Sequence, residues 1–137
     1  MRVAIEVDIP SDVQYIDNIV RLVRRQCEDE RFSPGLCSLN VTVALTEALS
    51  NAILRGNHED PNKHVRVKVA FSDAEMVVEI ADEGAGFDFE HLVIDPTTPE
   101  NLLREDGRGL FLMRRLMTRV EQFFDRGNVI RLTLLRA

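Results

Sequence analysis

Glu47 and Asn51 are the first residues whose types and spacing suggest chemistry. They stand four positions apart in a segment with helical periodicity, so their side chains lie on one side of that helix. Mg²⁺ prefers oxygen ligands and takes many of them from phosphates and water, and the Asn51 amide oxygen suits that role. A carboxylate one turn away can orient or deprotonate an attacking hydroxyl. Alone, however, a Glu and an Asn at this spacing are most often solvated surface residues.

Asp82 ends a predicted strand and leads into a turn that contains Gly84 and Gly86. Glycines allow positive φ and a close approach of the backbone to a ligand. A carboxylate at this point can accept a hydrogen bond from an amino group such as that of adenine, and a buried acceptor left unpaired costs about 1–3 kcal/mol. An ordinary acidic turn is the alternative interpretation.

A second glycine cluster, Gly107-Arg108-Gly109-Leu110, stands at the predicted start of a helix. The first turn of a helix has free N–H groups and the positive end of the helix dipole, which favour phosphate. Glycines in this position also occur as simple caps. The three segments together, in this order along the chain, indicate a nucleotide site.

The elements that must position these groups follow from hydrophobic periodicity. Alternation predicts strands over residues 2–9, 65–71, 76–81, 121–124 and 129–135. A helix is expected to begin at Ser11, with Gln14 completing a capping box. A second helix is expected from about residue 34 to 55, ended by Gly56 and Asn57, and a third from Gly109. The apolar stripe of the first helix is Val13, Ile16, Val20, Val23 and Cys27.

This order of elements predicts an α+β fold, a two-layer sandwich in which helices cover one face of a mixed, mostly antiparallel sheet. Alternation of Val65, Val67 and Val69 with Arg66 and Lys68 predicts one buried and one solvated face. The first strand is expected at an edge of the sheet. Residues 83–108 have little periodicity and are expected to form a long loop, of which residues 87–108 could supply a flexible lid.

Composition and charge bound the function. The chain has 137 residues, a mass of 15.6 kDa and a net charge of −6, which fits one domain over residues 1–137. It has no long basic run, so direct nucleic-acid binding is disfavoured. No apolar run is expected to span a membrane. Cys27 and Cys37 suit reduced core thiols, and the expected compartment is the cytoplasm.

The chain has no P-loop and no protein-kinase signature. It resembles instead the Bergerat-type (GHKL) ATPases, and within them the anti-sigma-factor serine/threonine kinases. Residues 47–52 (EALSNA) resemble the N box of that family, 82–88 (DEGAGFD) the G1 box, and 107–113 (GRGLFLM) the G2 box. Residues 95–103 are similar to the family's lid, so the resemblance spans essentially the whole chain.

The resemblance implies roles for matching positions. Asn51 would bind Mg²⁺, Glu47 would be the catalytic carboxylate, and Asp82 would hold adenine. The residues that would shape the pocket or contact phosphate are Gly84, Gly86, Gly107, Arg108, Gly109 and Leu110. Arg55 could reach a phosphate, although an arginine near the negative end of a helix dipole is also explained without a ligand. Relatives often begin the last strand with Gly-Thr-Thr, whereas this chain has Gly127-Asn128-Val129.

The function that the resemblance implies is that of an ATP- and Mg²⁺-dependent serine/threonine kinase and anti-sigma factor. Its partners would be a STAS-type antagonist, which it phosphorylates, and a sigma factor or another regulator; a homodimer is also expected, and neither nucleic acid nor membrane. The alternative is an ATP-binding partner-switch module without kinase activity. Two further alternatives are a detached sensor histidine kinase domain, disfavoured because no helical hairpin carries an acceptor histidine, and a structural domain with coincidental glycines.

Overall fold

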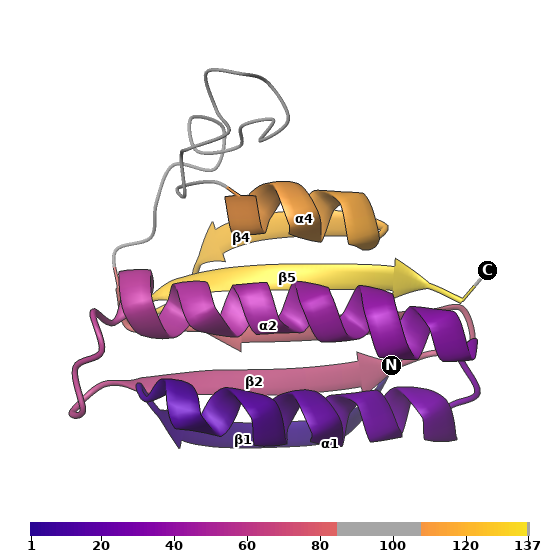
Figure 1. Cartoon of the computed structure of the whole chain (residues 1–137), viewed down its shortest axis with the longest axis horizontal. Helices are drawn as coiled ribbons and strands as arrows, with labels where there is room; N and C mark the ends of the chain where they lie inside the picture. Colours follow the sequence, from indigo (N-terminus) through magenta and orange to yellow (C-terminus); the bar gives the residue numbers. More distant parts are fainter. Residues whose placement is uncertain (85–107, 137) are drawn as a thin grey trace.

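An antiparallel sheet with helices on one face forms the fold in the computed structural model, which describes residues 1–84 and 108–136 (Figure 1). Across the sheet the strands are β1 (Arg2–Pro10), β2 (His64–Phe71), β3 (Glu75–Ala81), β5 (Asn128–Leu135) and β4 (Arg119–Phe124). The helices α1 (Ile16–Asp29), α2 (Thr42–Asn51) and α4 (Arg108–Leu116) cover one face. The predicted α+β two-layer sandwich is confirmed, and β1 is an edge strand as expected.

The helix that contains α2 is the long element of the helical layer. π-helical turns, Leu36–Val41 and Ala52–Gly56, continue it at both ends, so it runs over 21 residues from Leu36 to Gly56. Within the described residues it is long and apolar enough to cross a membrane by length and composition alone, a test that the core helix of a soluble protein also passes. Its apolar side packs in the core, with Leu45, Ala48 and Leu49 all at most 1% exposed, which accounts for its composition.

Strands β2, β3 and β5 supply the sheet side of the core through alternation of side chains. On β3, for example, Met76, Val78 and Ile80 are at most 1% exposed and face the helices. The matching residues of the neighbouring strands are Val65, Val67, Val69, Phe71, Ile130, Leu132 and Leu134. The predicted single buried face is therefore present, and its width is set by three adjacent strands.

A bulge in β1 changes the predicted alternation at the start of the chain. The pairing with β2 shifts between Val3 and Ile5, so Ala4 is an extra residue on the β1 side. As a result Val3 is 48% exposed while Ile5 is 8% exposed. The alternation predicted for residues 2–9 is therefore interrupted at Ala4, and Val3 does not share the buried face with Ile5.

The start of the first helical segment also differs from the expected one. Asp12, not Ser11, is the N-cap, and its carboxylate accepts a hydrogen bond of 3.0 Å from the Gln14 N–H. Ser11 is 3% exposed, and its hydroxyl donates to the Lys63 carbonyl oxygen at 2.7 Å. Ser11 is unavailable as a cap because it holds the loop that precedes β2. A 3-10 turn, Val13–Tyr15, precedes α1, and Val13 is 45% exposed and lies outside the core stripe.

Cys27 and Cys37 lie in the core where α1 packs beside the first turns of the long helix. Both are free and fully buried, as expected for core thiols. Burial raises the pKa of the Cys27 thiol, and its contact with Cys37 raises that pKa further. The two sulfurs are therefore protonated and unreactive in the native protein.

The face of the sheet without helices carries charged residues in a cross-strand row. Along the row from β1 to β4 the signs alternate at Glu6, Lys68, Glu79, Arg131 and Glu121, and each of these residues is paired with the next in the strand ladders. The Arg131 guanidinium donates to Glu79 Oε2 at 2.8 and 2.9 Å and lies 4.6 Å from the centre of the Phe123 ring. We call these five residues the charge row.

Candidate functional site

Glu47, Asn51 and Gly109 meet where α4 begins against α2. A Cβ atom built on Gly109 would lie 2.8 Å from Glu47 Oε2 and 3.2 Å from Asn51 Nδ2. Both side chains are half-buried and point from α2 toward the first turn of α4. The structure therefore brings the predicted catalytic carboxylate and the predicted metal ligand together with one glycine of the second cluster, which lies 62 and 58 positions after them in the chain.

α4 is held against α2 at both of its ends. At its far end the Asn40 side chain donates to the Leu116 carbonyl oxygen at 2.6 Å, which satisfies a carbonyl group that the helix leaves free. Near its start Leu110 is 2% exposed and packs in the core. A nucleotide contact from Leu110 would therefore have to come from its backbone N–H. The first turn of α4, with its unpaired N–H groups, lies beside Glu47 and Asn51.

Asp82 is a buried carboxylate at the end of β3. It is 5% exposed, and its Oδ1 accepts a hydrogen bond of 2.7 Å from the Gly84 N–H. The Asn128 amide lies 3.4 Å from Oδ2, and the Asp82 N–H donates to the Asn128 carbonyl oxygen at 2.9 Å. Burial raises the pKa of the Asp82 carboxyl, and the hydrogen bonds from Gly84 and Asn128 partly oppose that shift.

Glycines surround Asp82 because there is no room for side chains. A Cβ on Gly56 would lie 2.3 Å from the Asp82 carboxylate carbon, and one on Gly84 would lie 2.4 Å from the Gly56 carbonyl oxygen. Gly127, in the turn between β4 and β5, has a φ of +147°, and its Cβ would lie 2.0 Å from the Asp82 carbonyl oxygen. Gly56 was expected only to end the helix; its close approach to Asp82 is the stronger reason for glycine at that position.

The long helix links the two groups of predicted site residues. Asn51 and Gly56 are five residues apart in it, which corresponds to about 7.5 Å along a helix axis. Gly56 touches Asp82 at one end of this stretch, and Asn51 lies beside Gly109 at the other. The geometry suits an extended ligand with a hydrogen-bonding amine at the Asp82 end and phosphates at the Gly109 end.

Mg²⁺ fits the Asn51 end by the chemistry of its donors. Asn51 offers an amide oxygen and Glu47 a carboxylate, and glycine at position 109 lets the start of α4 approach both side chains closely. Among residues 1–84 and 108–136 no group of three or more His, Cys, Asp and Glu side chains forms a metal cage. Mg²⁺ needs no such cage where a phosphate supplies the other oxygens.

Several predicted residues are not placed with this cluster. Gly86, Gly107 and residues 87–107 of the expected lid lie outside the described residues. Arg108 is the first residue of α4. Arg55 is exposed near the end of the long helix.

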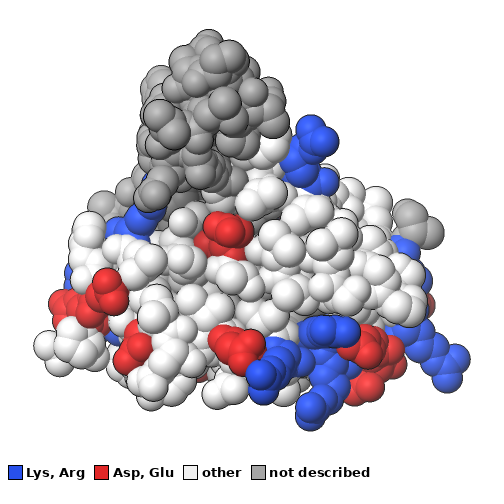
Figure 2. All heavy atoms as spheres, in the orientation of Figure 1, with Lys and Arg blue, Asp and Glu red and all other residues white. Residues whose placement is uncertain are grey.

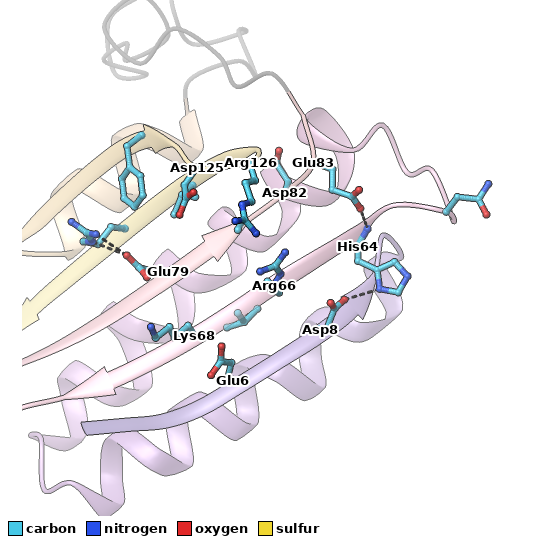
Figure 3. A pocket seen from close by; sticks show the side chains of 16 residues that line it. Glu6, Asp8, His64, Arg66, Lys68, Glu79, Asp82, Glu83, Asp125 and Arg126 are labelled. Carbon is cyan, nitrogen blue, oxygen red and sulfur yellow. Dashed lines mark hydrogen bonds and ion pairs between the residues drawn. The ribbon is translucent and has the colours of Figure 1, made fainter. Parts of the chain in front are cut away.

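A hollow of about 830 Å³ lies on the other, open face of the sheet (Figure 3). Charged side chains of β1 and β2 line it, with Arg66, Lys68, Glu6 and Asp8 pointing away from the helices and Arg126 reaching over from the β4–β5 turn. On the helix-covered face, by contrast, charged residues gather along the edge over α1, and most of the surface over α2 is uncharged (Figure 2). Of the predicted site residues that the structure describes, Asp82 alone borders the hollow.

Sequence reasoning missed three residues around Asp82, namely Gly56 as a close contact, Asn57 and Asn128. Asn128 was treated only as a departure from the threonines of relatives, yet its side chain is 2% exposed and faces the Asp82 carboxylate. Asn57 is 0% exposed and accepts a hydrogen bond of 2.8 Å from the Glu83 N–H. Asn57 and Asn128 could have been linked to Asp82 only if the fold, and so their burial beside the glycine turn, had been known.

Comparisons with known proteins identify the family of the chain. The family described as "Histidine kinase-like ATPase domain" matches residues 9–134. The chain is 31% identical over 121 residues to the serine-protein kinase RsbW of Bacillus subtilis (strain 168), covering 85% of this chain and 75% of that protein. It is 29% identical over 134 residues to the serine-protein kinase RsbW of Bacillus velezensis, covering 94% and 83%.

Among solved structures the fold is similar to that of the mycobacterial sensor histidine kinase MprB. The TM-score is 0.56 at 18% sequence identity, and the match covers 96% of this chain and 97% of that one. At this identity the likeness concerns the fold alone.

Proposed function

Because this chain belongs to the family of histidine kinase-like ATPase domains, we propose that it is an ATP-dependent serine/threonine-protein kinase that acts as a single domain. Relatives with 29–31% identity that carry the name serine-protein kinase support this choice over a histidine kinase. Binding of ATP follows from the family. The protein substrate, the metal and the residue roles below are proposals for this chain.

The observation that carries the proposal is the meeting of Glu47, Asn51 and the start of α4. Phosphoryl transfer needs the attacking hydroxyl held in line with the γ-phosphate and the charge on the phosphates stabilised. Asn51 would hold Mg²⁺ through its amide oxygen, and bound Mg²⁺ would neutralise the phosphate oxygens. The N–H groups of the first α4 turn would take phosphate oxygens on the other side.

Glu47 is proposed as the residue that orients the acceptor hydroxyl and takes its proton. Its carboxylate is half-buried beside Asn51, and its Oε2 lies against the Gly109 backbone. A carboxylate at hydrogen-bond distance from a serine hydroxyl can accept the proton as the oxygen attacks phosphorus. The proton passes to Glu47, the new P–O bond forms on the serine, and ADP leaves with the electron pair of the broken P–O bond.

Asp82 is proposed to recognise adenine. Its Oδ1 is engaged by the Gly84 N–H, while Oδ2 has only the long contact with Asn128 among the described residues. Oδ2 can therefore accept a hydrogen bond from the exocyclic amine of adenine. Asn128 would replace the hydroxyl that relatives supply from the last strand.

For the partner we propose a small antagonist protein of the STAS type as the phosphate acceptor, with a sigma factor or another regulator as the competing partner. The cytoplasm, where such partners act, is the proposed location. A homodimer is also proposed, supported by the exposed edge of β1, whose outer backbone groups pair with no strand among the described residues.

The proposed activity is tested by incubating the chain with Mg-ATP and the STAS-type protein encoded nearest its gene, followed by intact-mass analysis. We expect the acceptor to gain one phosphate, and Glu47→Gln to bind ATP normally and transfer none. ATP binding without transfer by the wild type would instead support a nucleotide-gated binding module. Equal transfer by both proteins would remove Glu47 from the chemistry.

A further inference from the structure

Asn57, the residue after the long helix, makes an unusually complete set of hydrogen bonds for a buried amide. Its Nδ2 donates to the Ser11 hydroxyl at 2.8 Å and to the His64 carbonyl oxygen at 2.9 Å. Its Oδ1 accepts from the Glu83 N–H at 2.8 Å. Both amide hydrogens and the amide oxygen are thus used, with the side chain 0% exposed.

These bonds join four separate segments at one point. Ser11 follows β1, Asn57 ends the helix that carries Glu47 and Asn51, His64 begins β2, and Glu83 is the residue after Asp82. Because each partner comes from a different element, Asn57 fixes the distance between the end of that helix and the turn at the end of β3.

The contacts on either side of this bond leave Asp82 no freedom to move independently. Gly56, immediately before Asn57, lies against the Asp82 carboxylate, and Gly84, immediately after Glu83, lies against the Gly56 carbonyl oxygen. Residues 56–57 and residues 82–84 therefore pack closely together. The hydrogen bond from the Glu83 N–H to the Asn57 side chain joins the two segments. A shift of Asn57 must move the Asp82 carboxylate.

We infer that Asn57 is a positioning residue that holds the Asp82 carboxylate where it can accept a hydrogen bond from the exocyclic amine of adenine. This inference rests on the proposed function, because it assumes that Asp82 binds the base. Asn57 itself is buried, and in this proposal it acts on the nucleotide through the Glu83 N–H and the backbone of the turn, not by direct contact.

The test compares ATP with inosine triphosphate, which carries a carbonyl oxygen in place of the exocyclic amine. Calorimetric titration of the wild type is expected to show at least about tenfold tighter binding of ATP, because the Asp82 oxygen repels a carbonyl. In Asn57→Ala we expect this preference to fall at least about fivefold, because a small displacement of the carboxylate weakens the amine bond.

Ser11→Ala is the matched control. It removes the bond from Asn57 to Ser11 and the bond from Ser11 to the Lys63 carbonyl oxygen, but leaves the bond between Asn57 and Glu83 in place. We expect it to lower the melting temperature and to keep the preference for ATP within about twofold of the wild type.

The outcomes separate the inference from the function on which it rests. A wild type that binds both nucleotides equally removes the adenine role of Asp82 and the inference with it. If the wild type prefers ATP and Asn57→Ala shows the same preference, the inference is overturned but the adenine role of Asp82 stands. An equal loss in Asn57→Ala and Ser11→Ala does the same, because it reveals only general loosening.

If Asn57→Ala does not fold, hydrogen exchange of the wild-type Glu83 amide decides the matter. We expect exchange at least about a hundredfold slower than in an unstructured peptide, and slower again by about threefold or more when ADP is added. Exchange that ADP leaves unchanged overturns the inference.

Discussion

Ile80 and Glu79 are neighbours on β3 and face opposite sides of the same sheet. Ile80 is 0% exposed against the helices, whereas the Glu79 side chain is 26% exposed and pairs with Arg131 in the charge row. The covered face is apolar and closed, and the open face is charged and hollowed. The same strands thus place most of the stabilising contacts on one side and leave the other for polar interactions.

The candidate chemistry does not lie in the hollow of the open face. The open face has the hollow of about 830 Å³, yet Glu47, Asn51 and Gly109 all lie in the helical layer on the covered side. Asp82 stands at the end of β3, where the two sides meet. The proposed site therefore rests on converging side chains and absent Cβ atoms and not on the size of a concavity.

The largest expected effect is the difference between the stability costs of substitutions on the two faces of the sheet. Ile80→Ala is expected to lower the free energy of unfolding by about 2–5 kcal/mol, because it leaves a cavity in the core. Glu79→Ala, one residue away, is expected to cost about 1 kcal/mol or less, because it removes a half-exposed ion pair. Urea denaturation of both variants checks this. Equal costs would show that the open face contributes to stability as the core does.

Gly109→Ala tests whether the covered side carries the chemistry. The added Cβ would push Glu47 Oε2 and Asn51 Nδ2 from their places, so phosphotransfer is expected to fall about a hundredfold with the fold intact. Gly35→Ala is the control, since a Cβ there has no heavy atom within 4 Å. It is expected to keep full activity and to gain about 0.5–1 kcal/mol of stability. Full activity in Gly109→Ala would remove the α2–α4 junction from the site.

Asp82→Asn probes the residue between the two faces. ATP affinity is expected to fall about tenfold, equal to about 1.4 kcal/mol, because the amide presents hydrogens toward the adenine amine. The stability of the folded state at neutral pH is expected to rise in this variant. Because burial raises the native pKa of Asp82, the native state holds its proton more tightly than the unfolded state.

Stability of the wild type should therefore fall as pH rises from the unfolded pKa of this carboxyl through its higher native pKa, and the cost should persist above that window. The amide that Asp82→Asn introduces cannot ionise, so the variant should melt at a higher temperature than the wild type at neutral pH and lose that advantage in acid. Melting curves across pH test this, and an advantage that persists in acid would point to packing instead.

Arg131→Met is expected to have the smallest effect. It keeps the packing on Phe123 but removes the bonds to Glu79, at a cost of about 1 kcal/mol that high salt should reduce. Arg66→Met on the same face is the control, since Arg66 has no ion pair within the described part of the chain, and its cost should be near zero. A cost for Arg131→Met that is indifferent to salt would contradict an electrostatic role for the charge row.

Much of the fold could be predicted from the sequence because its signals are local. The alternation in β2, β3 and β5 and the three-and-four spacing in α1 each report on a few adjacent residues. The predictions fail where a residue that has the right type for a local role forms a hydrogen bond with a distant residue instead. Ser11 has the right type for an N-cap, but the Lys63 carbonyl oxygen, 52 positions away, takes its hydroxyl.

Some residues of the candidate site could be predicted from their types and spacing, but the residues that contact them from distant parts of the chain could not. Glu47, Asn51, Asp82 and Gly109 stand out through residue types and spacing, and their positions in the structure form two linked groups. Asn57 and Asn128 do not stand out, because their bonds reach across 26 and 46 positions to the turn at Asp82. Contacts of that range depend on the sheet order, which no local pattern contains.

The charge row also protects the sheet against misassembly. If β5 slid by two residues so that Ile130 faced Val78 instead of Ile80, an apolar residue would still face an apolar one there, and only Asn128, brought opposite Ile80, would disturb the core. The same slide would set Arg131 opposite Arg119 on β4, a repelling pair, and take it away from Glu121. The charges of the open face thus add a penalty for the wrong alignment to the one that Asn128 imposes in the core.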